Sequence, residues 1–130
     1  MCSINSDFLK EEYRNGYLIT EKMKKVWAVE LDLLSELDRV CKKYNIKYYA
    51  AFGTLLGAIR DKGFIPWDDD IDVWLLRDEY ERLKQVAPKE FTGKYYYQDW
   101  YNSCGRTWIF SKLRNSETTA IEYPDKGPEF

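Results

Sequence analysis

The stretch 63-GFIPWDDDIDVWLL-76 decides how this chain of 130 residues is interpreted. Directly before an apolar run, it places four carboxylates within five residues, at Asp68, Asp69, Asp70 and Asp72. Side chains alternate between the two faces of a strand. A strand over residues 70–76 would therefore send its odd-numbered apolar side chains into a core and present Asp70 and Asp72 together on the other face.

Two carboxylates on one face repel, and each raises the pKa of the other. A divalent cation between Asp70 and Asp72 removes this conflict, and carboxylate oxygens suit Mg²⁺ or Mn²⁺, which also bind substrate phosphates. Asp68 and Asp69, at the loop end of the strand, can reach the same ion or its waters. The alternative is a solvated acidic loop that binds no metal. A calcium-binding EF-hand loop is disfavoured, because its sixth position needs glycine and the residue here is Val73.

A second pattern precedes the acidic stretch, in 52-FGTLLGAIR-60. A strand that ends in Gly53-Thr54 at the start of a helix offers free backbone N–H groups and a hydroxyl, which together can bind a phosphate. Thr54 could equally be a plain helix cap without a ligand. Arg60 and Lys62 follow and can neutralise phosphate charge. A phosphate-binding turn followed by a metal-binding strand indicates phosphoryl or nucleotidyl transfer.

The remaining pattern predicts one α/β (α+β) domain over residues 1–130, with a mixed sheet flanked by helices. Residues 1–19 form a polar segment, irregular or a short helix. A long amphipathic helix spans 20–44, begun by Thr20 and ended by Asn45, because apolar residues recur every three or four positions. The elements expected after it are a strand at 46–52, a helix at 54–62, a loop at 63–66, a strand at 70–76, a helix at 77–86 that stops before Pro88, and strands at 94–100, 106–114 and 118–123.

Composition excludes several classes of function. The formal net charge is −2, from 20 basic and 22 acidic residues, which gives no electrostatic basis for nonspecific nucleic-acid or membrane binding. The chain has no histidine, so catalysis by a histidine base is excluded. Its three cysteines are widely spaced, which disfavours a zinc site. No secretory signal and no apolar run of about 20 residues occurs, so a cytoplasmic protein without a transmembrane segment is expected.

The combination of a Gly-Thr turn with Asp-x-Asp is similar to the nucleotidyltransferase superfamily. More specifically, 48-YYAAFGTLLGAIRDKGFIPWDDDIDVWLLRDEYERL-83 resembles the LicD family, which is related to the fukutin group. The helix that contains VWAVELDLLSELDRVCKKYNIKYYA and the later segment SKLRNSETT resemble the regions that flank this motif in the family. The resemblance covers residues 12–123.

The resemblance implies a metal-dependent transferase. Such proteins move a substituted phosphate, such as phosphocholine, from a CDP-linked donor to a sugar of a surface glycan, such as lipopolysaccharide or teichoic acid. Asp70 and Asp72 would be metal ligands supported by Asp68, which is also the candidate base. Gly53 and Thr54 would contact the donor phosphates, with Arg60 nearby. Residues assigned to the donor side are Arg114, Ser116, Thr118 and Thr119.

The chain departs from the family pattern in two places. Asp61 stands where the family usually has histidine, and the family's third carboxylate, in a segment resembling GIFIDIFPLD, is not evident. Glu122 is one late acid that could take its place. The chain is therefore expected to correspond to the N-terminal part of the family domain. A non-catalytic or remnant module that binds metal or nucleotide remains the alternative, and a homodimer formed through uncovered apolar surface is a further expectation.

Overall fold

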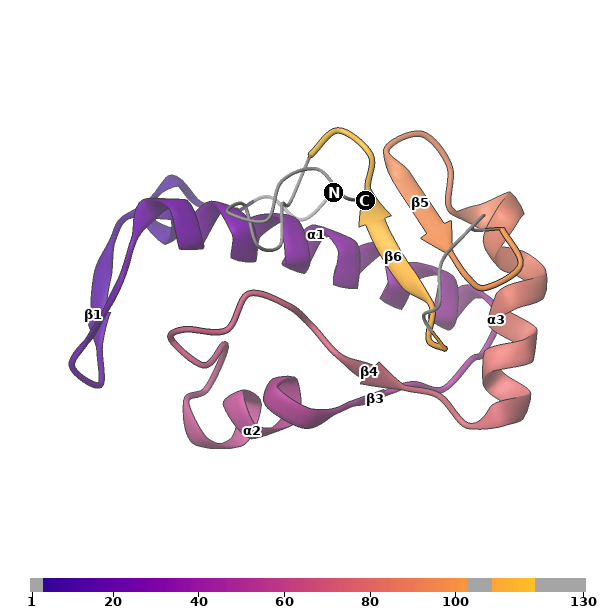
Figure 1. Cartoon of the computed structure of the whole chain (residues 1–130), viewed down its shortest axis with the longest axis horizontal. Helices are drawn as coiled ribbons and strands as arrows, with labels where there is room; N and C mark the ends of the chain where they lie inside the picture. The colour runs from indigo at the N-terminus through magenta and orange to yellow at the C-terminus, as the bar shows by residue number, and fades with distance from the viewer. Residues whose placement is uncertain (1–3, 103–108, 119–130) are drawn as a thin grey trace.

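The structure is a computed structural model that describes residues 4–102 and 109–118. Its longest element is the helix α1 (Glu21–Lys43), which runs along the long axis of the molecule (Figure 1). The other elements, in chain order, are the 3₁₀ turn η1 (Ser6–Leu9), β1 (Glu12–Arg14) and β2 (Tyr17–Ile19) before α1, and β3 (Tyr49–Ala50), α2 (Phe52–Arg60), β4 (Val73–Trp74), α3 (Arg77–Glu90), β5 (Tyr95–Gln98) and β6 (Lys112–Asn115) after it.

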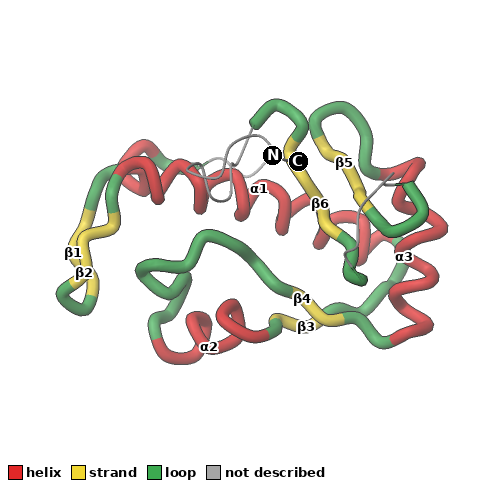
Figure 2. Tube along the Cα trace, viewed as in Figure 1, coloured by secondary structure: helices red, strands yellow, loops and turns green. Residues whose placement is uncertain are grey.

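The strands of the described part pair as three two-stranded antiparallel sheets, β1–β2, β3–β4 and β5–β6. Figure 2 shows that β3, β4 and α2 lie on one side of α1, whereas β5 and β6 lie with α3 at its C-terminal end. The predicted α/β class is confirmed. The ladders between the strands are short, so packing against α1 holds the separate parts together.

The predicted helix 20–44 is confirmed, as are both of its end signals. The Met23 N–H donates to the Thr20 hydroxyl at 3.2 Å, which satisfies one of the free amides of the first turn. At the other end, Asn45 adopts a left-handed φ of 50°, and the Ile46 N–H donates to the Cys41 carbonyl at 2.8 Å. This arrangement is how helices commonly terminate, with asparagine replacing the usual glycine.

The hydrophobic core lies between the C-terminal half of α1 and α3. Its buried residues are Val40, Cys41, Ile46, Leu83, Ala87 and Phe91. Tyr95, Tyr97 and Leu113 bring β5 and β6 against this cluster. Polar contacts add to the attachment, since Asp32 of α1 accepts hydrogen bonds from Lys94 at 2.6 Å and Tyr95 at 3.1 Å.

The N-terminal segment contains a hairpin that the sequence analysis missed. Asn15 and Gly16 have φ values of 53° and 78°, which a two-residue hairpin turn requires, and Asn-Gly is the strongest sequence signal for such a turn. Glu12 of β1 forms an ion pair at 3.0 Å with Lys24 of α1, whose side chain is almost fully buried. The hairpin is thereby attached to the first half of α1.

Several predicted boundaries were wrong. The strands expected at 46–52 and 70–76 are reduced to two residues each. The backbone turns into α2 at Phe52, and the Asp72 N–H bonds the Thr54 hydroxyl instead of a ladder partner. The helix expected to stop before Pro88 continues to Glu90. Proline removes one helical hydrogen bond, but buried Ala87 and Phe91 keep this turn in the core, and the Phe91 N–H donates to the Ala87 carbonyl at 2.9 Å.

The late strands agree in part with prediction. The strand expected at 94–100 is confirmed as β5. Within 106–114 the described residues form a strand only from Lys112, and β6 ends at Asn115. Of the strand expected at 118–123, all positions after Thr118 lie outside the described residues.

Glu90 generates a prediction about acid stability. Its side chain is 6% exposed and accepts hydrogen bonds from Lys43 and from the Tyr44 hydroxyl, both at 2.7 Å. The bond from Lys43, then the bond from Tyr44, lower the pKa of Glu90 from its ordinary 4.5 to about 2. A carboxyl whose pKa is lower in the folded state stabilises the fold above its unfolded pKa, and this contribution is lost as pH falls toward the folded pKa.

We therefore expect the free energy of unfolding to fall between pH 4.5 and about 2, and Glu90→Gln to remove part of this slope. Urea denaturation at a series of pH values measures it. A Glu90→Gln variant that loses stability with acid as steeply as the wild type would show that these bonds do not have this role.

Candidate active site

Trp27 of α1 holds the acidic loop, defined here as residues 63–72. The Trp27 side chain is buried, and its ring stacks on Phe64 with centroids 4.7 Å apart and an interplanar angle of 6°. Its indole N–H donates to the Asp68 carbonyl at 2.7 Å. Ile65 and Pro66 are buried between these two contacts. The backbone before the aspartates is therefore fixed on α1.

Two glycines of α2 allow the same loop to approach the helix closely. A Cβ atom at Gly53 would lie 2.5 Å from Asp68 Oδ2, and one at Gly57 would lie 2.5 Å from the Gly63 carbonyl oxygen. Either contact is shorter than real Cβ atoms show. A larger residue at Gly57 would displace the loop backbone, and one at Gly53 would move the Asp68 carboxylate. Gly53 was predicted to face donor phosphates; in the structure it faces the Asp68 carboxylate.

Thr54 connects α2 to the end of the acidic loop. Its hydroxyl oxygen accepts a hydrogen bond from the Asp72 N–H at 2.8 Å, and the Ala51 N–H donates to the Asp72 carbonyl at 3.0 Å. The helix cap is Ala51, without a side-chain hydrogen bond, so the interpretation of Thr54 as a helix cap was wrong. The contact with donor phosphate stays a prediction, and the Thr54 hydroxyl retains a proton to donate.

The first residue of α2 has an unusual backbone. Phe52 has a φ of 42°, in the left-handed region that residues with a Cβ atom rarely adopt. Its ring meets Trp74 of β4 edge-on at 5.2 Å, which helps to hold this conformation. Local strain of this kind is concentrated at binding and catalytic sites. Here it lies directly before the free amides of the α2 N-terminus.

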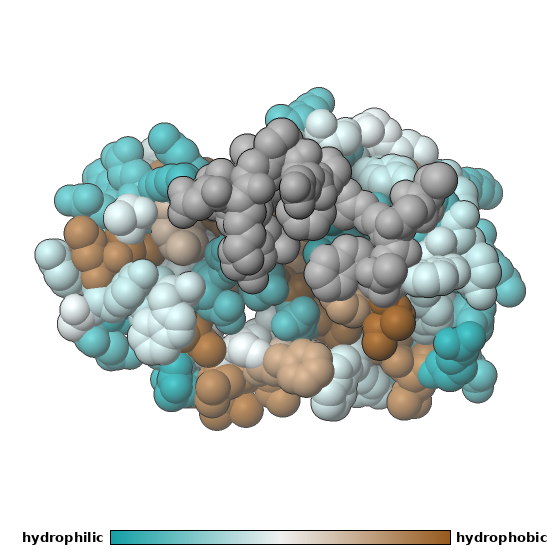
Figure 3. All heavy atoms as spheres, in the orientation of Figure 1, coloured by the Kyte–Doolittle hydropathy of each residue, from teal (hydrophilic) through white to brown (hydrophobic). Residues whose placement is uncertain are grey.

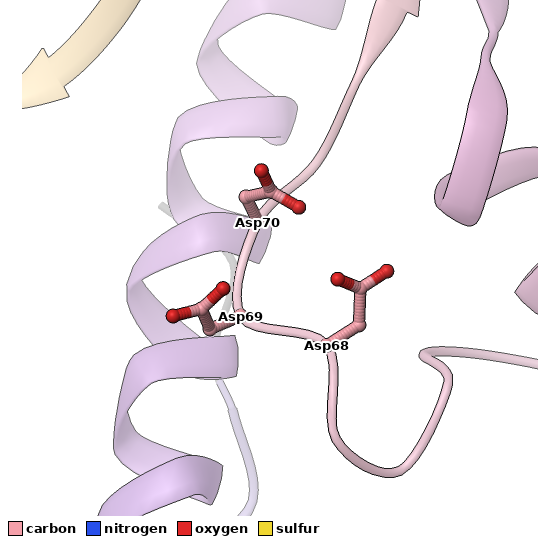
Figure 4. A group of neighbouring side chains, drawn as sticks. All are labelled: Asp68, Asp69 and Asp70. Atoms are coloured by element: carbon pink, nitrogen blue, oxygen red, sulfur yellow. The ribbon is translucent and has the colours of Figure 1, made fainter. Parts of the chain in front are cut away.

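The structure brings three carboxylates of the acidic loop together. One oxygen from each of Asp68, Asp69 and Asp70 lies within 4.8 Å of the others, and Figure 4 shows the three side chains leaving consecutive positions beside α1. The Asp70 side chain is exposed, but partial desolvation, followed by the charges of Asp72, Asp68 and Asp69, raises its pKa to about 6. The negative charge of this cluster is thus poorly compensated by the protein.

Asp72 lies at the end of the acidic loop. Residues 70–72 are outside β4, and Ile71 lines the same pocket as Asp70. Asp72 acts on Asp70 through its charge but is not in the group of three. Asp69, which was expected to reach the ion or its waters, is in that group. The metal role of these residues stays a prediction.

A fourth carboxylate, missed by the sequence analysis, approaches from α1. Burial and then the charges of Asp70 and Asp69 raise the pKa of Glu30 to about 7. Glu30 follows Trp27 by three positions, so both lie on the side of α1 that meets the acidic loop. A signal for it existed in the helix pattern, since the acidic Glu30 interrupts the apolar face next to the buried Trp27.

Arg60 is engaged away from the acidic loop. Its Nε donates to Asp61 Oδ2 at 2.9 Å, and the Asn15 side chain donates to Asp61 Oδ1 at 3.2 Å. The Asp61 side chain is only 1% exposed. Asp61, the residue that replaces the family's histidine, therefore joins the hairpin to α2. Arg60 lies at the opposite end of α2 from Gly53, and its role near the donor stays a prediction.

A pocket with a volume of about 300 Å³ adjoins the acidic loop. Its wall is formed by residues of α1, of α2 and of the acidic loop. The lining includes Trp27, Leu31, Gly53, Thr54, Asp68 and Asp70. Arg14 and Lys62 contribute the positive charge of this lining. Figure 3 shows the same face of the molecule hollowed between the α1 side and the α2 side. The pocket offers an apolar cavity with acids at one part of its wall and bases at another.

The residues predicted for the donor side lie elsewhere. Arg114 is in β6, and its Nε is buried without a hydrogen-bond partner among the described residues. The hydroxyls of Ser116 and Thr118 donate to the carbonyls of Lys94 and Asn115 at 3.2 and 3.3 Å. None of these lines the pocket, and their contact with a donor stays a prediction. Thr119 and Glu122 lie outside the described residues.

The outer face of α2 is apolar and exposed. Figure 3 shows hydrophobic spheres along the lower edge, where α2 lies in Figure 1. The exposed apolar residues of α2 are Phe52, Leu55, Leu56 and Ile59, with exposures of 67%, 46%, 47% and 65%. This surface is of the kind expected to pack against further protein. The homodimer expected from the sequence stays a prediction.

An α/β chain with a Gly-Thr helix start held against a carboxylate cluster has the features of the nucleotidyltransferase class. The sequence profile described as "LicD/FKTN/FKRP, nucleotidyltransferase domain" matches residues 45–125. The chain therefore belongs to the LicD/FKTN/FKRP family, as the resemblance predicted.

Individual relatives agree with this assignment. The chain is 55% identical over 56 residues to the lipopolysaccharide cholinephosphotransferase LicD of Haemophilus influenzae, a match that covers 43% of this chain and 21% of that protein. It is 35% identical over 135 residues to an uncharacterized protein of Rickettsia prowazekii, covering 93% of this chain and 50% of the relative. A Rickettsia typhi protein, also uncharacterized, is 35% identical over 118 residues, covering 84% and 37%.

The chain thus spans half the length or less of these relatives. No solved structure matches it. Within the described residues, none of the helices has the length and apolar character needed to cross a bilayer.

The link between Thr54 and Asp72 gives a prediction about stability. Thr54→Val removes the acceptor without changing the shape of the side chain, and leaves the Asp72 N–H unpaired. We expect a loss of roughly 1–3 kcal/mol in the free energy of unfolding. Thr54→Ser keeps the hydroxyl and should lose less. Denaturant unfolding of both variants measures the difference, and equal losses in the two would argue against the hydrogen bond.

Proposed function

We propose that this chain carries the metal and donor site of a LicD-type transferase. The reaction would move a substituted phosphate, such as phosphocholine, from a CDP-linked donor to a sugar hydroxyl of a surface glycan. The observation that supports it most is the uncompensated carboxylate cluster held against the N-terminus of α2, in a chain of this family. The similarity to a lipopolysaccharide cholinephosphotransferase supports the choice of substituent and acceptor.

The residues fit a divalent cation. Asp68, Asp69 and Asp70 supply hard oxygen ligands close together, and the raised pKa of Asp70 reflects a negative charge that a cation would compensate. A bound Mg²⁺ or Mn²⁺ would neutralise charge on the donor's phosphates as the transferred group moves. We propose Asp68, Asp69 and Asp70 as its protein ligands, with Asp72 adding negative charge nearby.

The other residues would orient the donor. The first amides of α2, including that of Gly53, have no partner within the helix and can bind phosphate oxygens. The pocket beside them, lined by Trp27 and Leu31, has room for an uncharged part of the donor. The proton of the attacking sugar hydroxyl would pass to a carboxylate, for which Asp68 is our candidate. A new P–O bond forms to the sugar, the pyrophosphate P–O bond breaks, and CMP leaves.

A second candidate is a module that binds the cation and nucleotide without catalysing transfer. What favours it is that a segment resembling GIFIDIFPLD, which carries the family's third carboxylate, is not evident in residues 1–130. The two functions share the binding step and differ in turnover. The cytoplasmic location expected from the sequence also stays a prediction.

The proposal is tested by calorimetry with Mn²⁺ and CDP-choline, followed by an assay for CMP release in the presence of a lipopolysaccharide acceptor. We expect wild type to bind Mn²⁺, and Asp70→Asn to weaken binding about tenfold or more because it removes a charged ligand. Asp78→Asn, on exposed surface at the start of α3, is the matched control and should bind normally.

The outcomes separate the candidates. Binding with CMP release supports the transferase, whereas binding without release supports the module. Wild type and Asp70→Asn that both fail to bind Mn²⁺ would contradict the proposed site.

A further inference from the structure

The hairpin formed by β1 and β2, residues 12–19, contacts the acidic loop at two points. Arg14 of β1 donates from its Nη1 to the Phe64 carbonyl at 3.4 Å. Beyond the turn, the Tyr17 ring meets the Trp67 ring edge-on, with centroids 5.7 Å apart and an interplanar angle of 67°. Phe64 and Trp67 both belong to the segment that leads directly into the aspartates. The hairpin therefore contacts the backbone and a side chain of that segment.

The Arg14 side chain is itself fixed by neighbours. Its Nη2 pairs with Glu12, and Glu12 pairs at 3.0 Å with the almost fully buried Lys24 of α1. The Arg14 guanidinium also lies over the Trp27 ring, 5.7 Å from the centroid. Trp27 is the residue whose indole N–H holds the acidic loop on α1. Arg14 thus contacts the loop backbone directly and also the tryptophan that fixes this loop.

Arg14 lines the same pocket as the carboxylates of Asp68 and Asp70. An arginine in this place can affect a bound cation in two ways. Its positive charge opposes the binding of another cation. Its contacts with the loop favour binding, because ligands that are already held in place lose less freedom when the ion binds. The two effects have opposite signs, so an experiment can separate them.

We propose that the N-terminal hairpin positions the acidic loop for the divalent cation, with Arg14 as the positioning residue. The inference rests on the proposed function, because it concerns the same cation. It gives a role in the site to a hairpin that precedes residues 45–125, the part of the chain that the family profile matches. Partners that orient metal ligands without touching the ion contribute strongly to metal affinity. Arg14 would act in this way through the loop backbone and Trp27.

The experiment compares the full chain as wild type, Arg14→Gln, Tyr17→Leu and Arg77→Gln. Arg14→Gln removes the guanidinium contacts and one positive charge, whereas Tyr17→Leu removes the ring contact with Trp67 without changing the charge. Arg77→Gln is the matched control for charge, since Arg77 is exposed and pairs with Glu81 on α3. Mn²⁺ affinity is measured by the electron paramagnetic resonance signal of free Mn²⁺. Amide hydrogen exchange is measured by nuclear magnetic resonance in the presence of a chelator.

We expect Arg14→Gln to raise the Kd for Mn²⁺ about tenfold, Tyr17→Leu to raise it less, and Arg77→Gln to match wild type. The Asp68 N–H donates to the Ile65 carbonyl at 3.0 Å inside the acidic loop. Without metal, exchange of this amide should accelerate in Arg14→Gln, while amides of α3 exchange as in wild type. This difference separates a loosened loop from a general loss of stability, which would accelerate both.

Failure of this inference can be told apart from failure of the proposed function. If Arg14→Gln and Tyr17→Leu bind Mn²⁺ as tightly as wild type or more tightly, the hairpin does not position the loop, but the cation site remains. Equal acceleration of exchange in α3 and at Asp68 would also overturn the positioning role. If Arg14→Gln does not fold, Tyr17→Leu decides by the same measurements. If wild type itself binds no Mn²⁺, the proposed function is overturned, and this inference with it.

Discussion

The hydrogen bond from the Trp27 indole to the Asp68 carbonyl is the contact on which the site depends. Together with the stacking of Trp27 on Phe64, it fixes the acidic loop on α1 at the point where the aspartates begin. From the opposite side, Gly53 and Gly57 let the loop approach α2 more closely than any larger residue would allow. The loop is thus held between two helices, which fixes the backbone from which its carboxylates extend.

This confinement explains the electrostatics. Carboxylates on a flexible surface loop would separate into water and keep ordinary pKa values. Here desolvation and neighbouring charges raise the pKa of Asp70 to about 6 and that of Glu30 to about 7. The fold therefore maintains a concentration of negative charge at a cost in stability, which is typical of sites shaped by function. A divalent cation is the partner whose charge and ligand preference match it.

Sequence reasoning predicted some elements well because their signals are local. The period of α1, with Thr20 and Asn45 at its ends, needed no tertiary information. The Asn15-Gly16 turn was equally local and could have been recognised. By contrast, the strand expected at 70–76 failed because the Asp72 N–H bonds Thr54, a residue 18 positions earlier. Pro88 remains inside α3 because of core packing around Ala87 and Phe91, which no local rule conveys.

The sequence predicted that the Gly-Thr turn and the acidic stretch form one site. It did not predict which carboxylates of that site lie together. Strand alternation selected Asp70 and Asp72, whereas the loop groups Asp70 with Asp68 and Asp69. Whether Glu30 lies near the acidic loop depends on which side of α1 meets that loop. A helical period shows that a face exists, but not what it contacts.

The central claim is that a divalent cation binds at the carboxylates of the acidic loop, Asp68, Asp69 and Asp70. Paramagnetic broadening of backbone amide signals by substoichiometric Mn²⁺ in a nuclear magnetic resonance spectrum tests it most directly. The account predicts that amides of residues 68–72 and of the α2 N-terminus broaden first, while those of β5 and β6 stay sharp. Broadening spread evenly over exposed acids, or centred away from the acidic loop, would contradict it.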